Sequence, residues 1–175
     1  RQPRQWNVWQ WQMKNRLRNL QQLAVYFPVP RETMARCENA ADTFPFAVTP
    51  YYLSLAARYD EHDPILRQCL PDPAETEFSL GGVPDPLGEE EHTPVAGLIR
   101  RYPDRCLAIM TNFCATYCRH CNRKRRWKER AAAMTRRSLQ RQIDYIARTP
   151  AIREVIVSGG DPLTLNETTL DWFLG

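Results

Sequence analysis

The spacing of apolar residues predicts a helical first half of the chain. Apolar side chains recur at alternating steps of three and four residues along one face, at Trp6, Trp9, Met13, Leu17, Leu20 and Ala24. This period predicts an amphipathic helix over residues 5–24, which the Pro-Val-Pro run at 28–30 ends. A second helix is expected over 31–42. Further prolines cut the next stretch into short pieces, of which 51–57 and 65–70 are predicted to be helical.

The second half of the chain alternates strand and helix patterns. Residues 105–113 form an apolar run that predicts a buried strand, and the β-branched run at 154–158 predicts a second one. Between them, residues 139–146 place Leu and Ile on one face of a helix that Pro150 stops. Strand, helix and strand in this order predict a right-handed parallel βαβ unit. A further helix is expected from about Asn166.

The segment from Pro71 to Gly97 separates these two styles of sequence. It contains seven acidic residues, no Lys or Arg, and several Gly and Pro residues that favour turns. We therefore predict an α/β protein in two parts. Residues 1–97 form a helical region with an acidic linker, and residues 98–175 form the sheet-containing part.

Composition and charge narrow the class of protein. The chain has 175 residues, of which 43% are apolar and 25% charged, as in an ordinary globular protein. No apolar run approaches the roughly 20 residues that cross a bilayer, and no signal segment is present, so we expect neither membrane insertion nor secretion. A net charge of +4 is too mild to indicate a nucleic-acid partner. More than half of the basic residues nevertheless lie between Arg100 and Arg141, around a group of cysteines.

Three of the six cysteines are closely spaced, as Cys114-x3-Cys118-x2-Cys121, at the carboxyl end of the first predicted strand. The others show no ligand spacing and are expected to be buried apolar side chains: Cys37, Cys69 and Cys106. A disulfide framework is not favoured, because three cysteines within such a short loop cannot all pair with one another. Soft thiolates on one loop indicate a metal centre instead.

Two kinds of metal centre are considered for the Cys114–Cys121 loop. Structural zinc normally takes four protein ligands, and the nearby His120 stands between two cysteines, where it is badly placed for the same ion. Three cysteines without a fourth fit a [4Fe–4S] cluster with one open iron, which can bind a small molecule. A fortuitous run of structural cysteines is the remaining interpretation. It is disfavoured because the ends of parallel strands are where such folds place their chemistry.

These residues resemble the cluster motif of the radical S-adenosylmethionine (SAM) superfamily, and the Gly-rich turn at 158–161 resembles its SAM-binding turn. Longer stretches are similar to the lysine 2,3-aminomutase family: 6–12, 49–55, 93–98, 101–105, 117–125 and 157–163. That family uses SAM as a radical initiator. It uses pyridoxal 5′-phosphate (PLP) to hold an amino acid while its amino group moves from C2 to C3.

The resemblance implies a role for each candidate site residue. The cluster ligands would be Cys114, Cys118 and Cys121. The SAM-binding residues would be His120 against the adenine, and Ser158, Gly159, Gly160 and Asp161 at the amino group. Arg123 would bind the substrate carboxylate, and Arg101 and Arg105 would lie near the PLP phosphate. The basic run at 124–130 would neutralise these anionic groups; the alternative is a nucleic-acid patch or a nuclear localisation signal.

The resemblance also implies a partial (β/α)6 barrel, of which this chain supplies the first βα units after its helical region. The PLP-binding lysine is expected outside this chain, which we interpret as the N-terminal part of a longer protein. The expected substrate is lysine, with glutamate or arginine as alternatives. Three competing interpretations are a lysine mutase that modifies a translation factor, a radical SAM enzyme without PLP, and a non-enzymatic zinc or nucleic-acid-binding module. We further expect an electron donor such as flavodoxin or ferredoxin, a homo-oligomer, and a cytoplasmic location.

Overall fold

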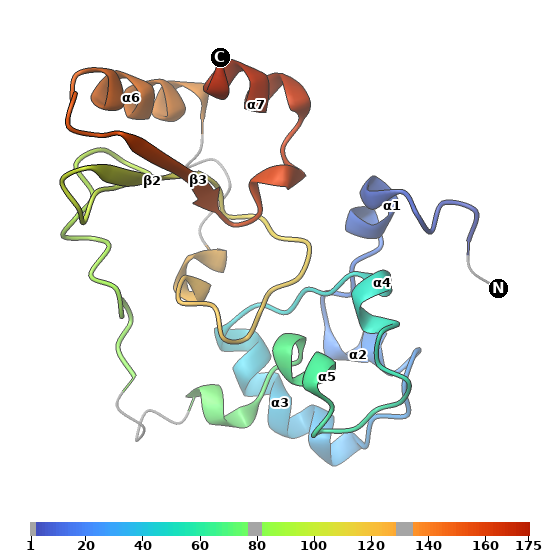
Figure 1. Cartoon of the computed structure of the whole chain (residues 1–175). Helices are drawn as coiled ribbons and strands as arrows, with labels where there is room; N and C mark the ends of the chain where they lie inside the picture. The colour runs from blue at the N-terminus through green and yellow to red at the C-terminus, as the bar shows by residue number, and fades with distance from the viewer. Residues whose placement is uncertain (1–2, 77–81, 129–134) are drawn as a thin grey trace. The chain divides into compact units, whose positions relative to one another are not determined.

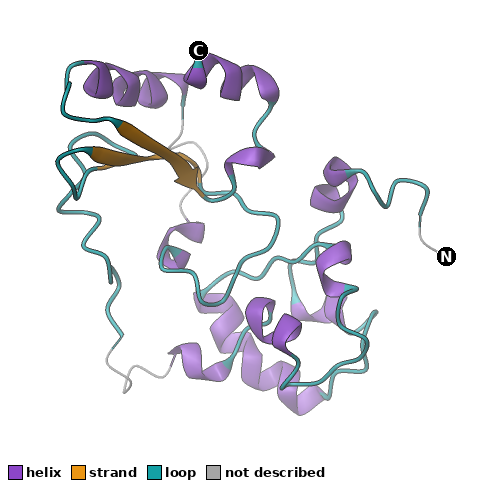
Figure 2. Cartoon of the chain, viewed as in Figure 1, coloured by secondary structure: helices purple, strands orange, loops and turns teal. Residues whose placement is uncertain are grey.

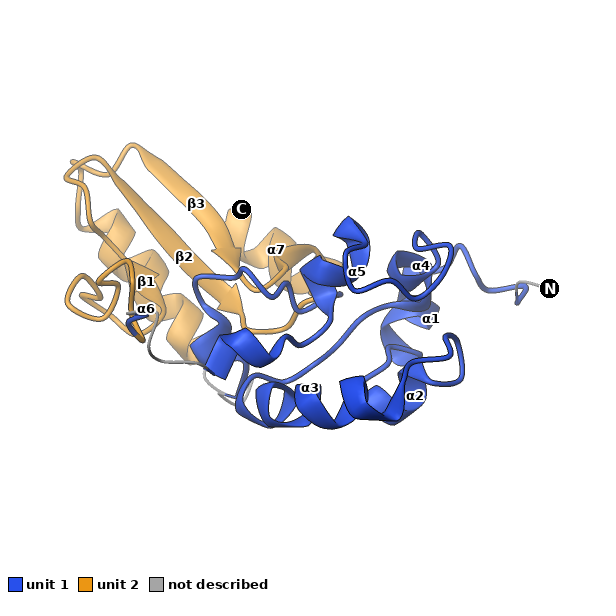
Figure 3. Cartoon of the chain, turned by 90° about the horizontal axis from the view of Figure 1, so that it is seen from below, with its two compact units in different colours: residues 1–83, 115–128 blue, residues 84–114, 129–175 orange. Residues whose placement is uncertain are grey.

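The computed structural model describes residues 3–76, 82–128 and 135–175. Part of the predicted acidic linker, at 77–81, and the end of the predicted basic run, at 129–130, lie outside these described residues. The chain divides into two compact units, coloured separately in Figure 3. Unit 1 comprises residues 1–83 and 115–128, and unit 2 comprises residues 84–114 and 129–175. Each unit has an apolar core of its own.

Unit 1 is helical, as Figure 1 shows. Its α-helices are α1 (Trp9–Lys14), α2 (Leu20–Leu23), α3 (Arg31–Thr43), α4 (Pro50–Leu53) and α5 (Pro64–Cys69), and its short 3-10 helices are η1 (Pro73–Thr76) and η3 (Lys124–Lys128). Apolar side chains from these helices and their connections form one core: Leu17, Leu23, Phe27, Phe46, Val48, Leu53, Ala56, Leu66 and Cys69. Burial of this core is the main favourable term that holds the short helices together.

The predicted continuous helix over 5–24 is wrong, because the chain breaks it into α1 and α2. Between the two helices, Leu17 extends and pairs with Val48, with backbone hydrogen bonds of 2.9 and 3.1 Å in the two directions. Asn19 then caps α2 by accepting a hydrogen bond from the backbone N–H of Gln22. The apolar period is present in the sequence, but pairing with a distant segment overrides the helical preference.

The remaining helices of unit 1 largely follow the sequence prediction. Helix α3 matches the expected 31–42 segment to within a residue, and α5 begins at Pro64, with Asp63 as its N-cap. The helix predicted over 51–57 is shorter than expected, since α4 ends at Leu53. Thr49 caps α4, and Pro50 occupies its first position.

Unit 2 contains a three-stranded sheet with α-helices on one face, as Figures 1 and 2 show. Strand β2 (Arg105–Thr111) lies between β1 (Leu98–Ile99), which is antiparallel to it, and β3 (Glu154–Gly159), which is parallel. Helices α6 (Arg136–Ala147) and α7 (Glu167–Leu174) follow β2 and β3, and the 3-10 helix η5 (Pro162–Thr164) precedes α7. The predicted order of strand, helix and parallel strand is confirmed, and so is the α/β class; the short strand β1 was not predicted.

The two faces of the sheet differ in their surroundings. Cys106 and Ala108 of β2 pack with Leu98 in an apolar core to which residues of α6 and α7 contribute. The alternate positions of β2 face the other way, and their register partners on β3 are Glu154, Ile156 and Ser158. Ile156 is 44% exposed. The prediction that β3 is a buried strand is therefore wrong for this face, because β3 is an outer strand of the sheet and only its other face meets the helices.

The division into units differs from the predicted boundary after residue 97. Residues 84–97 group with the sheet, where Glu89 is buried and the backbone N–H of Arg100 donates to the His92 carbonyl at 2.7 Å. Residues 115–128 group with the helical unit. The cysteine loop thus leaves the sheet after Cys114 and joins the helices, which no composition change in the sequence indicates.

Within the described ranges, no helix is both long enough and apolar enough to cross a membrane.

The core of unit 1 provides a test of its packing. Leu53 is 1% exposed at the end of α4, whereas the neighbouring Leu55 is 50% exposed. We expect Leu53→Ala to lower the free energy of unfolding by about 2–5 kcal/mol, because it removes buried apolar surface and leaves a cavity. Leu55→Ala is the matched control and should change it by less than about 0.5 kcal/mol. Equal effects in denaturant unfolding of the two variants would contradict the packing described.

Candidate metal centre

The predicted site residues fall into both units. Cys118, His120, Cys121 and Arg123 lie on the loop that belongs to unit 1, whereas Cys114 ends the first segment of unit 2. The remaining predicted residues also belong to unit 2, namely Arg101, Arg105, Ser158, Gly159, Gly160 and Asp161. The candidate residues are therefore divided between the two units.

The cysteine loop of unit 1 is held to the helical unit by its backbone. The N–H of Tyr117 donates to the Ala47 carbonyl at 2.8 Å, and the N–H of Arg119 donates to the Gln68 carbonyl at 2.8 Å. One of these bonds precedes Cys118 and the other follows it, so the backbone path of the loop is fixed on both sides of this cysteine. The loop then turns back, with the Cys121 N–H donating to the Cys118 carbonyl at 2.9 Å.

Arg119, between Cys118 and His120, is buried rather than exposed. Only 5% of its side chain is accessible, and its guanidinium donates to both carboxylate oxygens of Glu75 at 2.8 and 2.9 Å. The same guanidinium donates to the carbonyls of Phe44 and Pro45 at 3.0–3.3 Å. A planar guanidinium is well suited to this bidentate contact with a carboxylate. The hydrogen bonds compensate the charge of Arg119, whose side chain is largely removed from water.

Aromatic and basic side chains complete this packing. The rings of Tyr117 and Trp127 stack with centroids 4.6 Å apart and an interplanar angle of 9°. Arg119 lies over Trp127, with its guanidinium carbon 5.5 Å from the ring centroid. The Lys124 ammonium donates to Glu75 at 3.0 Å and lies 4.3 Å from the Phe44 ring centroid. Trp127 is buried, so the described part of the basic run packs against the unit instead of forming a continuous solvated patch.

The two thiols of this loop are half-buried and form no disulfide. Burial and the neighbouring Cys121 raise the pKa of Cys118. Cys121 Sγ accepts a hydrogen bond from the backbone N–H of Arg123 at 3.4 Å. N–H donors to sulfur stabilise thiolate charge and tune iron–sulfur centres, so this contact suits a metal-bound sulfur. His120, between the two cysteines, has an exposed ring.

In unit 2, the glycine turn after β3 lies directly against the segment that leads to Cys114. The Gly160 N–H donates to the Thr111 carbonyl, and the Asp161 N–H donates to the Phe113 carbonyl at 2.8 Å. Asp161 Oδ1 accepts from the backbone N–H of Leu163 at 3.1 Å and so caps η5. Ser158 pairs with Ile109 in the parallel register. The structure thus brings the predicted SAM-binding turn and the first cysteine's segment together at the carboxyl ends of β2 and β3.

Two glycines of this turn are required by close backbone approach. A Cβ on Gly160 would lie 2.5–2.8 Å from backbone atoms of Phe113. Gly159 has φ +118°, a conformation that favours glycine, and a Cβ there would meet the Thr111 carbonyl. The backbone of this turn therefore packs too closely against the segment 111–113 to accept a side chain at either glycine.

Arg101 and Arg105 lie near the amino end of β2, at the opposite end of that strand from Cys114. Arg105 pairs with Asp104 at 3.1 Å and with Glu154 at 3.6 Å. Hydrogen bonds from Arg105 and Arg153 lower the pKa of Asp104 to about 2. By the alternation of β2, Arg105 shares a sheet face with Ser158. A phosphate at Arg105 would have to compete with two carboxylates. Arg101 is exposed and lines a depression with His92, Arg100 and Tyr145.

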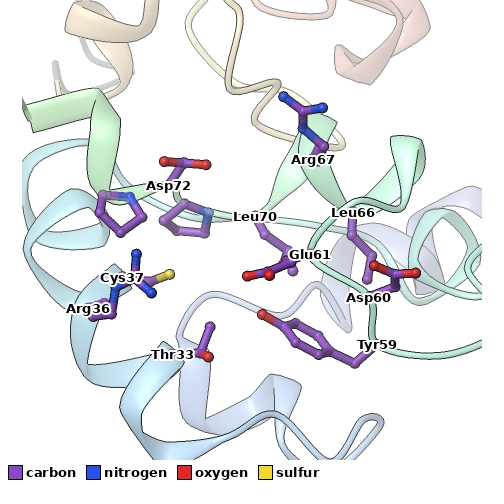
Figure 4. A pocket seen from close by; sticks show the side chains of 12 residues that line it. Thr33, Arg36, Cys37, Tyr59, Asp60, Glu61, Leu66, Arg67, Leu70 and Asp72 are labelled. Atoms are coloured by element: carbon purple, nitrogen blue, oxygen red, sulfur yellow. The ribbon is translucent and has the colours of Figure 1, made fainter.

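The other cysteines are separate from these groups. Cys69 and Cys106 are buried, as predicted, and burial followed by the effect of Cys118 raises the pKa of Cys69 to about 12. Cys37 is only half-buried, contrary to the prediction. It lines a cavity of about 120 Å³ in unit 1, and Figure 4 shows it there with Arg36 and Asp72.

The donor set fits an iron–sulfur cluster. Three thiols carry no disulfide, and an N–H group already donates to one of the sulfurs. Among residues 3–76, 82–128 and 135–175, no three His, Cys, Asp or Glu side chains are gathered around a position for one metal ion.

Comparison with known proteins defines the class. Residues 108–174, which contain the three spaced cysteines and the glycine turn, match the Radical SAM superfamily. Along 97% of its length the chain is a relative of the L-lysine 2,3-aminomutases. It is 38% identical to L-lysine 2,3-aminomutase of Clostridium subterminale and 41% identical to a putative L-lysine 2,3-aminomutase of Aquifex aeolicus. The predicted family resemblance is confirmed.

The relatives are longer than this chain and do not all bear one substrate name. The chain covers 41% of the Clostridium subterminale protein and 46% of the Aquifex aeolicus protein. It is also 37% identical, over 97% of its length, to glutamate 2,3-aminomutase of Clostridioides difficile, of which it covers 40%.

Sequence reasoning missed two residues of this site, Arg119 and Glu75. Arg119 carries no pattern of its own between a cysteine and a histidine, and Glu75 is one of several acidic residues in the predicted linker. An Arg inside the cysteine motif is the one feature of the sequence that points to this contact. It does not predict which carboxylate binds it, because Glu75 is 44 positions away.

The tight approach of Gly160 to Phe113 generates a prediction. We expect Gly160→Ala to destabilise the protein by roughly 1–3 kcal/mol, because the added methyl group forces the backbone of the turn or of Phe113 to shift. Gly82→Ala is the matched control, since a Cβ there meets nothing within 4 Å. If thermal unfolding, followed by circular dichroism, gave the same midpoint for both variants, the close approach would be refuted.

Proposed function

We propose that this chain forms the cluster-binding and SAM-binding part of a radical SAM amino acid 2,3-aminomutase, an isomerase that acts on lysine. The observation that carries this proposal is the cysteine spacing at the end of β2, in a segment that matches the superfamily, with the glycine turn packed beside it. Identity to proteins named L-lysine 2,3-aminomutase extends over both units and supports the specific reaction.

Cys114, Cys118 and Cys121 are the proposed ligands of a [4Fe–4S] cluster. Such a cluster, when bound, supplies an electron to SAM at its open iron. The chain's own share is to hold the thiolates and protect them. Tyr117 and Arg119 fix the loop through backbone hydrogen bonds, and the Arg123 N–H offsets negative charge on Cys121 Sγ. Since burial raises the pKa of Cys118, metal binding must displace its proton, which makes loading weaker at low pH.

The SAM-binding role is proposed for Ser158, Gly159, Gly160, Asp161 and His120. Glycines let the turn backbone come close to a ligand, and one oxygen of Asp161 caps η5, leaving the other to accept from an ammonium group. The exposed ring of His120 offers a face for a purine.

Three arginines are proposed to bind the substrate and PLP. Arg123 is the proposed partner of the substrate carboxylate, since a guanidinium binds a carboxylate through two parallel hydrogen bonds. Arg101 and Arg105 are proposed near the PLP phosphate. PLP, if bound, would carry the amino group of the substrate.

Glutamate is the second candidate substrate, because a glutamate 2,3-aminomutase is also 37% identical to the chain. We also propose a cytoplasmic location, a reducing partner such as flavodoxin or ferredoxin, and a homo-oligomer.

The cluster assignment is tested by iron content. After anaerobic reconstitution of the intact protein, we expect about four iron and four sulfide per chain, as a [4Fe–4S] cluster requires. Cys118→Ala should lose most of this iron, because a ligand is removed, whereas Cys106→Ala, which alters a buried cysteine of the unit 2 core, should retain it. Iron retained equally by both variants, or zinc in place of iron, would overturn the assignment.

A further inference from the structure

The contacts of Arg119 extend beyond what a superfamily motif explains. Glu75 belongs to η1, at the edge of the segment that the sequence marks as an acidic linker, yet only 10% of its side chain is exposed. Two cations of the cysteine loop converge on this one carboxylate, Arg119 and Lys124. Two cationic partners compensate the charge of this buried carboxylate, whereas loss of a partner removes part of that compensation.

These contacts lie next to both thiols along the chain. Arg119 follows Cys118 directly, and Lys124 lies three residues after Cys121, so the two cations that bind Glu75 flank Cys121 in the sequence. The Arg119 guanidinium also donates to the backbone carbonyls of Phe44 and Pro45. Arg119, inside the turn that carries the two thiols, and Lys124, just after that turn, are thereby held to one carboxylate of the helical unit.

We propose that Glu75 is a positioning residue for the metal centre, acting through Arg119 and Lys124 to hold Cys118 and Cys121 in the conformation that binds the cluster. This proposal rests on the function proposed above. It assigns a role to the first unit that the cysteine motif alone does not contain: the N-terminal helical region is the support on which two of the three cluster ligands are mounted.

The test is iron release from the reconstituted, intact protein. In Glu75→Gln the carboxylate charge is lost while the side-chain shape is kept, so we expect iron transfer to an excess of chelator to be about tenfold faster or more, as for other residues that orient metal ligands. The electron paramagnetic resonance spectrum of the remaining reduced cluster should also change. Glu61→Gln is the matched control, since the Glu61 side chain is 67% exposed, and it should match the wild type in both measurements.

A second variant separates positioning from folding. The double variant Glu75→Met, Arg119→Met replaces the two most buried charges by apolar side chains and leaves only Lys124, whose side chain is 26% exposed, without its carboxylate. It should therefore preserve the fold better than either single change. We expect its circular dichroism to match the wild type while iron release remains fast. Slow release and an unchanged resonance spectrum in both variants would overturn the role of Glu75, with the cluster itself intact. A wild-type protein that takes up no iron would instead refute the function proposed above.

Discussion

The buried ion pair between Arg119 and Glu75 links the chemistry of this chain to its helical unit. It satisfies a guanidinium and a carboxylate that are both nearly removed from water, and it does so between a residue inside the cysteine motif and one 44 positions earlier. A charge pair of this kind contributes less net stability than an apolar core, but it specifies which surfaces must meet. The stacked rings of Tyr117 and Trp127 then close the loop around it.

The sheet of unit 2 positions the other candidate residues. Parallel pairing of β2 and β3 brings their carboxyl ends to one edge, where Cys114 and the glycine turn follow. The turn fits against Phe113 only because residues 159 and 160 lack a Cβ. Rigid strands thus position one thiol and the proposed SAM-binding backbone, while the helical unit positions the other two thiols.

Local patterns predicted the elements well where local forces decide them. The β-branched run of β3, the apolar face of α6 and the start of α7 near Asn166 depend on residues that are close in the sequence. The long N-terminal helix failed because Leu17 pairs with Val48, a contact that no local period encodes. The cysteines, the glycine turn and the family were predicted from spacing and resemblance. The contacts that hold the cysteine loop to the helical unit were not predicted. They depend on an ion pair between residues far apart in the sequence and on Trp127, which is buried although it stands in an otherwise polar run.

The central claim is that the spaced cysteines hold a [4Fe–4S] cluster with one iron open to SAM. Mössbauer spectroscopy of the anaerobically reconstituted, intact protein, with and without SAM, tests it most directly. The account predicts a [4Fe–4S] signal in which one of the four irons changes on addition of SAM. A spectrum with no [4Fe–4S] signal, or one in which the signals of all four irons stay unchanged on addition of SAM, would contradict it.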